Sequence, residues 1–356
     1  MSRFACAAVS LALAACTSAG DDDPPARAAT VDAAGAVGSG TAAASGGGDE
    51  INPRLLRRFR AVVGAKQVPT TPEQVALGRM LFFDPRLSLH DDISCNSCHA
   101  LDRYGVDHLR TSVGSEGQHG NRNAPTVFNA STHIAQFWDG RAATIEDQAH
   151  GPILNSREMG MPDEPAVLAR LAASPEYAAA FRAAFPEDPD PIAMNRVGDA
   201  IGAFERGLVT TSRWDAFVAG DEKALTAAER HGLKLFMEVG CMGCHTGPQV
   251  GGTMFQHVGV MEPWPNQTDP GRAGVTQDSA DRMVFKVPSL KNIAQTAPYF
   301  HDGSVTDLHD AVKMMGRYQL GVDLSAPEID AIVTWMGSMT GRVDPAYIAP
   351  PKLPGR

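Results

Sequence analysis

The body of the chain, from Ile51 to Tyr347, is patterned for helices. Alternation of apolar and polar residues is scarce, and Leu308, Val312 and Met315 keep a spacing that places them on one helix face. The pattern predicts an all-α fold.

Capping residues mark where several helices begin. Thr71-Pro72-Glu73-Gln74 is a capping box with Pro at the first helical position, and Thr226-Ala227-Ala228-Glu229 repeats the box before Leu233. Further starts are predicted at Asp190-Pro191 and at Ser325-Ala326-Pro327-Glu328.

A faint internal repeat divides the body. The segments 78–83 (GRMLFF) and 232–237 (GLKLFM) each precede a pair of cysteines, which favours a duplication over a chance likeness of two amphipathic helices. We place the boundary between the halves near Val209 to Asp221. The predicted parts are two tandem domains at 51–212 and 213–342 and a Pro-rich tail at 343–356.

The first fifteen residues have the form of a secretory signal. A short positive start is followed by the uncharged apolar run from Phe4 to Ala15, which is too short to span a bilayer permanently. The run ends in Leu13-Ala14-Ala15-Cys16, which resembles a bacterial lipobox, so we expect Cys16 to be acylated. An ordinary signal peptide is the alternative.

Residues 16–50 are predicted to form a flexible tether, because Thr17 to Glu50 consist mainly of Ala, Gly, Ser, Thr and Asp. The expected location is therefore the periplasm or cell envelope, with a lipid anchor at Cys16.

Charge excludes one class of partner. The 356 residues suggest more than one domain, and their net charge of −10 with no basic run argues against binding to nucleic acid. An acidic surface suits a basic partner.

Four of the six cysteines carry the clearest chemistry. Cys95-Asn96-Ser97-Cys98-His99 and Cys241-Met242-Gly243-Cys244-His245 are c-type haem attachment motifs. Two thiols separated by two residues reach the two vinyl groups of one porphyrin, while the adjoining histidine reaches the iron. A zinc or redox CxxC with an accidental His is the alternative. With only 6% aromatic residues, the chain would draw large planar groups for its core from two covalently attached haems.

The second axial position decides what each haem does, because an iron with two protein ligands transfers electrons and an open iron binds small oxidants. Met315 is the candidate ligand in the second half. Met314 and Tyr318 compete with it, and a core methionine is the ordinary alternative.

At residues 111–161 the sequence resembles the bacterial di-haem cytochrome c peroxidase family, which also includes the methylamine-utilisation maturation enzyme. The resemblance covers about Thr71 to Ser338. Besides the two CxxCH sites it rests on the segments Arg122-Asn123-Ala124-Pro125-Thr126, Phe137-Trp138-Asp139-Gly140-Arg141, Glu158-Met159 and Pro298-Tyr299-Phe300-His301-Asp302-Gly303-Ser304.

The resemblance implies two cytochrome c-like haem domains with different tasks. His245 and Met315 would bind the iron of the electron entry site, and His99 that of the peroxide site. Gln148 and Glu158 match the family's distal residues, where an amide orients peroxide and a carboxylate moves its proton. Without the motif, Glu158 and Gln148 would pass for solvated residues.

The resemblance also implies roles for four residues between the domains. Trp138 matches a tryptophan that lies between the haems and helps electrons to pass, although a core tryptophan is the plain alternative. Asn123, Thr296 and Pro298 match positions whose oxygens hold a calcium ion in relatives, and waters would complete the shell.

One position departs from the family. In many relatives a histidine follows Thr-Ser-x-Gly and occupies the sixth position of the peroxide haem until the other haem is reduced. Here Ser115 follows Thr111-Ser112-Val113-Gly114, and serine is a poor haem ligand. We expect an open or water-bound iron in the oxidised protein, with His119 as the alternative ligand.

The resemblance implies a peroxidase that reduces hydrogen peroxide to water with electrons from a small cytochrome c or cupredoxin. Homodimers occur among relatives. A maturation-type oxidase that modifies a partner protein is one alternative, which the missing histidine favours and Met315 opposes, because such enzymes place a tyrosine there. A non-catalytic electron carrier or sensor is the other.

Overall fold

The computed structural model describes residues 51–60 and 68–355, and it begins three helices where capping boxes predict them. At the first, the Thr71 hydroxyl accepts a hydrogen bond from the backbone N–H of Gln74 at 3.2 Å, and the Gln74 side chain accepts one from Thr71 N at 3.1 Å. Thr226 and Ser325 take part in the same reciprocal pair. The helices are α2 (Pro72–Phe83), α9 (Ala227–Glu238) and α12 (Ala326–Gly337).

The predicted start at Asp190-Pro191 is wrong by several residues. Helix α7 (Met194–Glu205) follows Ala193, which makes no side-chain cap. The segment before it is a turn, because the Asp188 carboxylate accepts hydrogen bonds from Asp190 N at 3.2 Å and from Arg196 Nε at 2.8 Å. A Pro beside an Asp thus marks a turn here.

The remaining elements are short, and helices dominate, as predicted. The other α-helices are α1 (Pro53–Leu56), α3 (Cys95–Cys98), α4 (Ile145–Leu154), α5 (Glu164–Ala172), α6 (Pro175–Ala184), α8 (Arg213–Ala219), α10 (Ala273–Thr276), α11 (Leu308–Met314) and α13 (Pro345–Ile348). A π-helical turn at Met315–Leu320 follows α11. The antiparallel strands β1 (Phe255–His257) and β2 (Val284–Lys286) form a two-stranded sheet.

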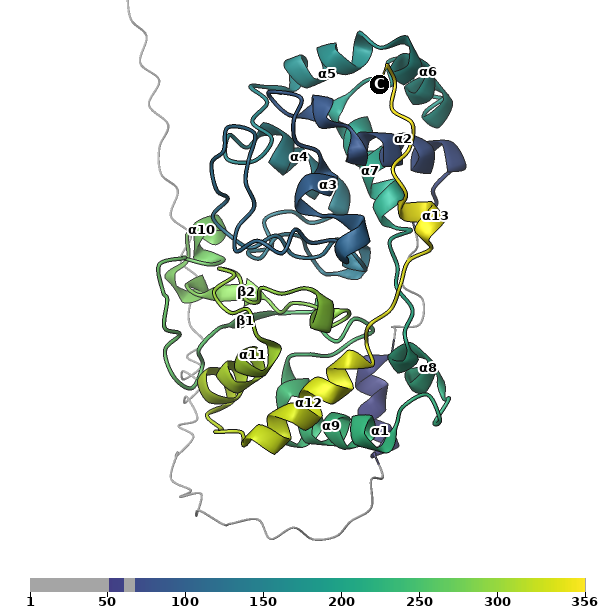
Figure 1. Ribbon diagram of the computed structural model, residues 1–356. Coiled ribbons are helices and arrows are strands. Elements are labelled where there is room, and N and C mark those ends of the chain that lie inside the picture. The colour runs from purple at the N-terminus through teal and green to yellow at the C-terminus, as the bar shows by residue number, and fades with distance from the viewer. Residues whose placement is uncertain (1–50, 61–67, 356) are drawn as a thin grey trace, which may run out of the picture. The chain divides into compact units, whose positions relative to one another are not determined.

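Each half is organised around one close crossing of two helices (Figure 1). Helix α2 crosses α7 at Gly78, where an added Cβ would overlap the carbonyl oxygen of Ala200. Helix α9 crosses α12 at Gly232, where a Cβ would overlap the carbonyl oxygen of Ala331. The two glycines open the repeated segments found in the sequence, so the repeat marks equivalent helix contacts.

Because these contacts have no room for a methyl group, we expect Gly78→Ala and Gly232→Ala each to lower the free energy of unfolding of the haem-loaded protein by about 1–3 kcal/mol. Gly337→Ala, at the end of α12, is the matched control, since a Cβ there meets no atom within 4 Å. Urea titration followed by circular dichroism measures all three. Equal stability of the crossing variants and the control would contradict the contact.

Two separate cores surround these crossings. The first joins residues of α2, α6 and α7, with Phe82, Tyr177 and Phe204 fully buried. The second joins α8, α9 and α12, and it also takes in Ile51 and Phe59 from the start of the described chain. The segment that contains Ile51 and Phe59 thus packs with the second half, although the predicted domain at 51–212 places it in the first.

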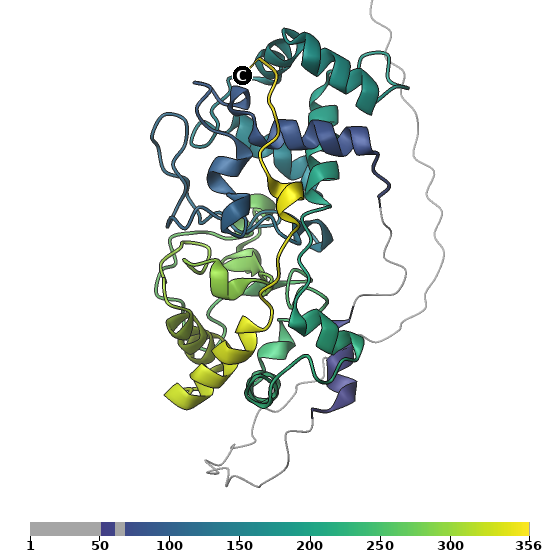
Figure 2. The ribbon, with the colours of Figure 1, turned by 45° about the vertical axis from the view of Figure 1, so that its right-hand side comes forward.

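The C-terminal tail returns from α12 to the first core (Figure 2). The Tyr347 ring stacks on Phe204 with centroids 5.2 Å apart, and its hydroxyl donates to the carbonyl of Phe204 at 2.7 Å. Arg79 donates to the carbonyls of Ala346 and Ala349, each at 2.9 Å. The predicted Pro-rich tail is therefore a strap across the first half.

The predicted signal peptide at 1–15, the tether at 16–50 and the acylated Cys16 lie outside the described residues. Within residues 51–60 and 68–355, no helix has the length and apolar character needed to cross a membrane.

Candidate functional site

A single cavity of about 1060 Å³ brings the predicted site residues together. Ligand pockets commonly measure about 300–1,000 Å³, so this one exceeds the space that a single drug-sized ligand needs. All thirteen predicted site residues line it: Cys95, Cys98, His99, Asn123, Trp138, Gln148, Glu158, Cys241, Cys244, His245, Thr296, Pro298 and Met315.

Each cysteine motif is held as one tight turn. In α3 the backbone N–H of His99 donates to the carbonyl of Cys95 at 2.9 Å, and in the second motif His245 N donates to Cys241 O at 3.1 Å. This bond closes the turn and brings the histidine back toward the first cysteine. The same geometry therefore occurs once in each half.

Three of the four motif thiols have raised pKa values, which favour the neutral thiol. None is in a disulfide. Burial raises the pKa of Cys98 to about 11 and that of Cys241 to about 12, and it raises that of Cys95 as well. Zinc binds thiolates, which such pKa values disfavour. Across the described part of the chain, no group of three or more His, Cys, Asp and Glu residues is arranged to hold a metal ion.

The two motif histidines are neutral, as iron ligands must be. Burial lowers the pKa of His99, and it lowers that of His245 to about 4. His245 Nδ1 lies 3.3 Å from the carbonyl oxygen of Val250, which leaves Nε2 free for a metal.

Buried polar atoms without partners collect at this cavity. They include His99 Nδ1, His133 Nε2, Glu158 Oε2 and His301 Nε2, and all four residues line the cavity. Buried polar groups are normally hydrogen-bonded. The cavity, its four cysteines and its neutral motif histidines together fit large apolar groups that carry iron and polar edges, as haem does.

Glu158 follows α4 and is held by its backbone. Glu158 N donates to Asn155 O at 2.9 Å, and Glu158 O accepts from Ser115 N at 2.8 Å. Its carboxyl is buried, which raises its pKa, while Arg141 and Asn155 oppose the rise. Gln148 lies on α4 and faces the same cavity. A carboxyl with a raised pKa and an amide thus line the same cavity.

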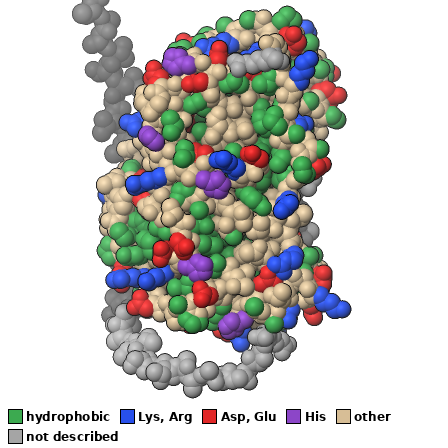
Figure 3. Space-filling view, in the orientation of Figure 1, with side chains coloured by type: hydrophobic (Ala, Val, Ile, Leu, Met, Phe, Trp, Pro, Cys, Tyr) green, Lys and Arg blue, Asp and Glu red, His purple; other side chains and the backbone are tan. Residues whose placement is uncertain are grey.

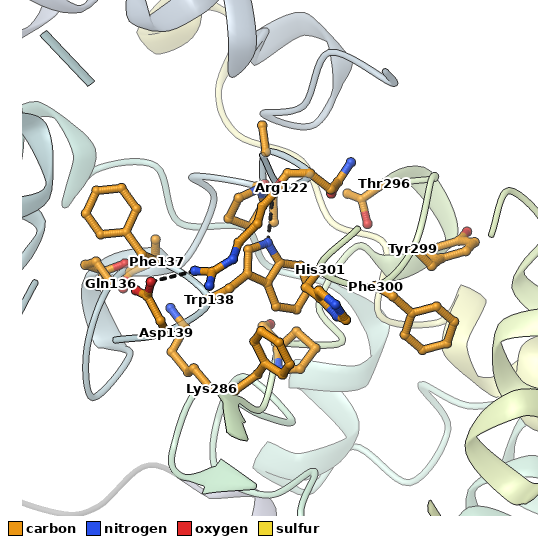
Figure 4. A pocket seen from close by; sticks show the side chains of 18 of the residues that line it. Arg122, Gln136, Phe137, Trp138, Asp139, Lys286, Thr296, Tyr299, Phe300 and His301 are labelled. Carbon is orange, nitrogen blue, oxygen red and sulfur yellow. Dashed lines mark hydrogen bonds and ion pairs between the residues drawn. The ribbon is translucent and has the colours of Figure 1, made fainter. Parts of the chain in front are cut away.

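Trp138 lies amid side chains from both halves (Figure 4). Its Nε1 donates to Asn123 O at 2.9 Å, and its carbonyl accepts from Lys286 N on β2 at 2.8 Å. The preceding Phe137 has φ of +64°, a strained value for a large side chain, and Arg141 stacks over its ring at 3.5 Å. Contacts from both halves therefore fix the indole.

Ion pairs tie the loops around Trp138. Arg122 donates from Nη1 to Asp139 at 2.6 Å and from Nε to Asp269 at 2.7 Å, which joins the two halves (Figure 4). Sequence reasoning singled out Arg122 and Asp139 only as parts of motifs, and it missed Asp269.

Met315 begins the π-helical turn after α11. Its side chain lines the cavity, whereas Met314 and Tyr318 do not. All three side chains pack against the small cluster around Trp264. A π turn shifts side chains relative to an α-helix and is frequent at functional sites. Of the three candidates, only Met315 lines the cavity, and its role as an iron ligand stays a prediction.

Ser115 and His119 do not line the cavity. The Ser115 hydroxyl donates to Asp92 Oδ1 at 2.6 Å. His119 Nδ1 lies 3.3 Å from the carbonyl of Thr111 at the exposed end of the same loop. Neither side chain is thus in contact with the space that the other predicted site residues share.

The three predicted calcium residues line the cavity but contribute no carboxylate. Asn123 already donates from Nδ2 to Leu109 O at 3.0 Å, and its backbone carbonyl accepts a hydrogen bond from Trp138 Nε1. Calcium takes six to eight oxygens, usually including carboxylates. These residues fit such an ion only in part.

Two buried ionisable residues escaped the sequence reasoning. Lys286 donates from Nζ to Ala135 O at 2.8 Å, and burial lowers its pKa to about 8. Glu205 ends α7 at the cavity wall. The sequence signal for Glu205 is a second pair of similar segments, D-A-I-G-A-F-E at 199–205 and D-A-I-V-T-W-M at 330–336.

Charges are mixed on the face shown in Figure 3, where Lys and Arg lie scattered among Asp and Glu without a continuous basic band.

Comparison with known proteins gives a consistent result. The family model for di-haem cytochrome c peroxidase matches residues 72–223. Cytochrome c551 peroxidase of Nitrosomonas europaea is 45% identical over 275 residues, which cover 77% of this chain and 81% of the relative. Methylamine utilization protein MauG of Methylorubrum extorquens is 34% identical, covering 84% of this chain and 86% of the relative. A solved MauG-like protein associated with microbial copper homeostasis aligns with a TM-score of 0.70 at 31% identity, covering 80% of this chain and 93% of that one.

Proposed function

Because this chain belongs to the di-haem cytochrome c peroxidase family, we propose that it reduces hydrogen peroxide to water with electrons from a small cytochrome c or cupredoxin. The observation that carries the proposal is the single cavity lined by both CxxCH motifs, Met315, Gln148 and Glu158. Peroxide-dependent oxidation of reduced cytochrome c by the haem-loaded chain is the test. Absence of turnover in a chain that holds both haems would refute it.

The two halves are proposed to be tandem cytochrome c-like domains, each with a covalently attached haem. The paired crossings at Gly78 and Gly232, each next to a CxxCH turn, support this division. When bound, the haems supply redox-active iron for peroxide reduction and electron transfer. His99 would hold the peroxide-side iron, and His245 and Met315 the iron that first receives electrons.

Glu158 and Gln148 are proposed to handle peroxide. Before the O–O bond breaks, one oxygen must lose a proton and the other must gain one. The buried Glu158 carboxylate can accept this proton and return it, and the Gln148 amide can orient the oxygens. Trp138, fixed between the halves, is proposed to assist electron passage.

The maturation-type alternative has less support. Such enzymes would place a tyrosine where Met315 lies, and Tyr318 packs outside the cavity. Because relatives named MauG also match this chain, the maturation-type alternative is tested as well. The peroxide assay with reduced cytochrome c separates it from the peroxidase.

With Ser115 bound to Asp92, we expect an open or water-bound iron in the first half of the fully oxidised protein. Addition of azide or fluoride to the diferric protein should therefore change its absorbance and EPR spectra without prior reduction. A purely low-spin first haem, unaltered by either anion, would contradict the open site and favour a shift of His119.

Export, anchoring and calcium belong to the same proposal. Covalent haem attachment suits the periplasm, where the predicted signal would deliver the chain and Cys16 would hold it on a membrane. Calcium at Asn123, Thr296 and Pro298 would bind weakly, because neutral oxygens and water complete its shell. A homodimer stays a prediction from the resemblance.

A further inference from the structure

A buried carboxyl group lies at the cavity wall outside the machinery described above. Glu205 is 5% exposed and lines the cavity at the end of α7. Among the described residues, none donates a hydrogen bond to its side chain or forms an ion pair with it. Burying an unpaired carboxylate is costly, so the protein holds this group at a price in stability.

The fold itself does not require a carboxyl there. The Ala200 and Phe204 that meet Gly78 correspond to the Ala331 and Trp335 that meet Gly232. In this register Glu205 corresponds to Met336, which is also 5% exposed and lines the same cavity. An apolar side chain fills the position in the second half, and only the half with His99, Gln148 and Glu158 carries an acid.

Burial and the charges around Glu205 place its titration point on the alkaline side of neutral pH. Burial, with Glu146 of α4 next to it, raises the pKa of Glu205 to about 8, and Arg206 opposes the rise. Arg206 is itself paired with Glu146. The third neighbour is the Cys95 thiol of α3.

The other elements packed on α7 add no charge that faces Glu205. Arg79 of α2 is turned to the tail carbonyls, and the tail presents the Tyr347 hydroxyl to Phe204 O. His150 of α4 faces the carbonyl of Met194, at the other end of α7. The short helix at Ala130–Thr132 has no titratable side chain.

We propose that Glu205 takes up one proton when an electron enters the first half of the cavity and so stores one of the two protons that peroxide reduction consumes. The inference rests on the proposed function. The balance is H₂O₂ + 2 e⁻ + 2 H⁺ → 2 H₂O, with both electrons from the donor protein. An added electron disfavours the nearby carboxylate in a medium of low dielectric constant, so Glu205 binds a proton from solvent.

The test is the pH dependence of the reduction potential of the first-half haem in the holoprotein. Above about pH 8, where the oxidised protein carries the Glu205 carboxylate, the equilibrium constant for reduction should fall by up to about tenfold per pH unit, or about 59 mV, in the wild type. Glu205→Gln, which keeps the size and removes the proton site, should flatten this dependence. Glu205→Met, which copies Met336, should do the same.

The haem of the second half is the internal control, and its pH dependence should not differ between the proteins. Glu158, His133, His301 and Lys286 also line the cavity and titrate, so the decisive quantity is the difference between wild type and variant. An unchanged dependence in both variants would overturn the proposal.

Infrared spectroscopy provides a second readout that needs no stable variant. The reduced-minus-oxidised spectrum of the wild type should contain a carboxylic acid C=O band that shifts in D₂O, and its absence would overturn the proposal. Peroxide turnover, measured on the same samples, keeps the two hypotheses apart. Turnover without the band or the slope removes the role of Glu205 alone, whereas a haem-loaded wild type without turnover removes the proposed function.

Discussion

Replacing Glu158 by Gln is expected to lower peroxide turnover about 10²- to 10⁴-fold, the range by which a positioned acid–base group accelerates a reaction. The amide keeps the size of the carboxyl but cannot accept and return a proton. Binding of both haems should not change, because neither CxxCH turn contacts this side chain through a hydrogen bond. Steady-state oxidation of reduced cytochrome c, at matched haem content, measures the loss.

The same assignment predicts how the turnover rate changes with pH. Burial raises the pKa of Glu158, so the carboxylate that must accept a proton is lost, as pH falls, at a higher pH than for an exposed glutamate. This acid-side fall in rate should disappear in Glu158→Gln. Glu116→Gln, in the neighbouring loop with a side chain 48% exposed, is the control and should keep wild-type rates. Wild-type turnover in Glu158→Gln would refute the catalytic assignment.

Replacing Met315 by His is expected to produce the largest change in redox behaviour. Axial ligands set haem potentials over roughly 0.8 V, and a methionine ligand raises the potential relative to histidine. The potential of the second-half haem should therefore fall steeply in Met315→His. Electrons from a high-potential donor would then no longer enter, and turnover with reduced cytochrome c should collapse. Potentiometric titration followed by absorbance measures the shift.

Met314→Leu is the matched control, because this neighbour packs against the same Trp264 cluster as Met315 but does not line the cavity. It should leave both potentials unchanged. A large shift of the potential in Met314→Leu, with none in Met315→His, would show that Met314 and not Met315 is the ligand.

Sequence signals that act within one helical turn predicted several features of the structure. A capping box depends on residues within one turn, which is why the starts of α2, α9 and α12 are correct. The CxxCH turn is equally local. The start of α7 was misplaced because Arg196, beyond the predicted start, binds Asp188 and stabilises a turn that Asp190-Pro191 alone did not reveal.

Long-range packing could not be read in the same way. Nothing in the sequence indicated that Lys286 would bond to Ala135 O, or that Ile51 and Phe59 would join the core of the second half. The sequence already favoured Met315 over Met314 and Tyr318, but that Met315 alone of the three lines the cavity needed the structure, because a π turn changes which side chains share a face. Gln148 and Glu158 were found only through the family motif, since neither carries a local pattern.

The central claim is that one cavity couples electron entry in the second half to peroxide reduction in the first. The most direct measurement is the ratio of donor oxidised to peroxide consumed, with the haem-loaded protein and reduced cytochrome c in a stopped assay. Two-electron reduction to water predicts two one-electron donors oxidised for each peroxide. A ratio near zero, with peroxide consumed while the donor stays reduced, would contradict the account. So would a haem-loaded protein that consumes no peroxide at all.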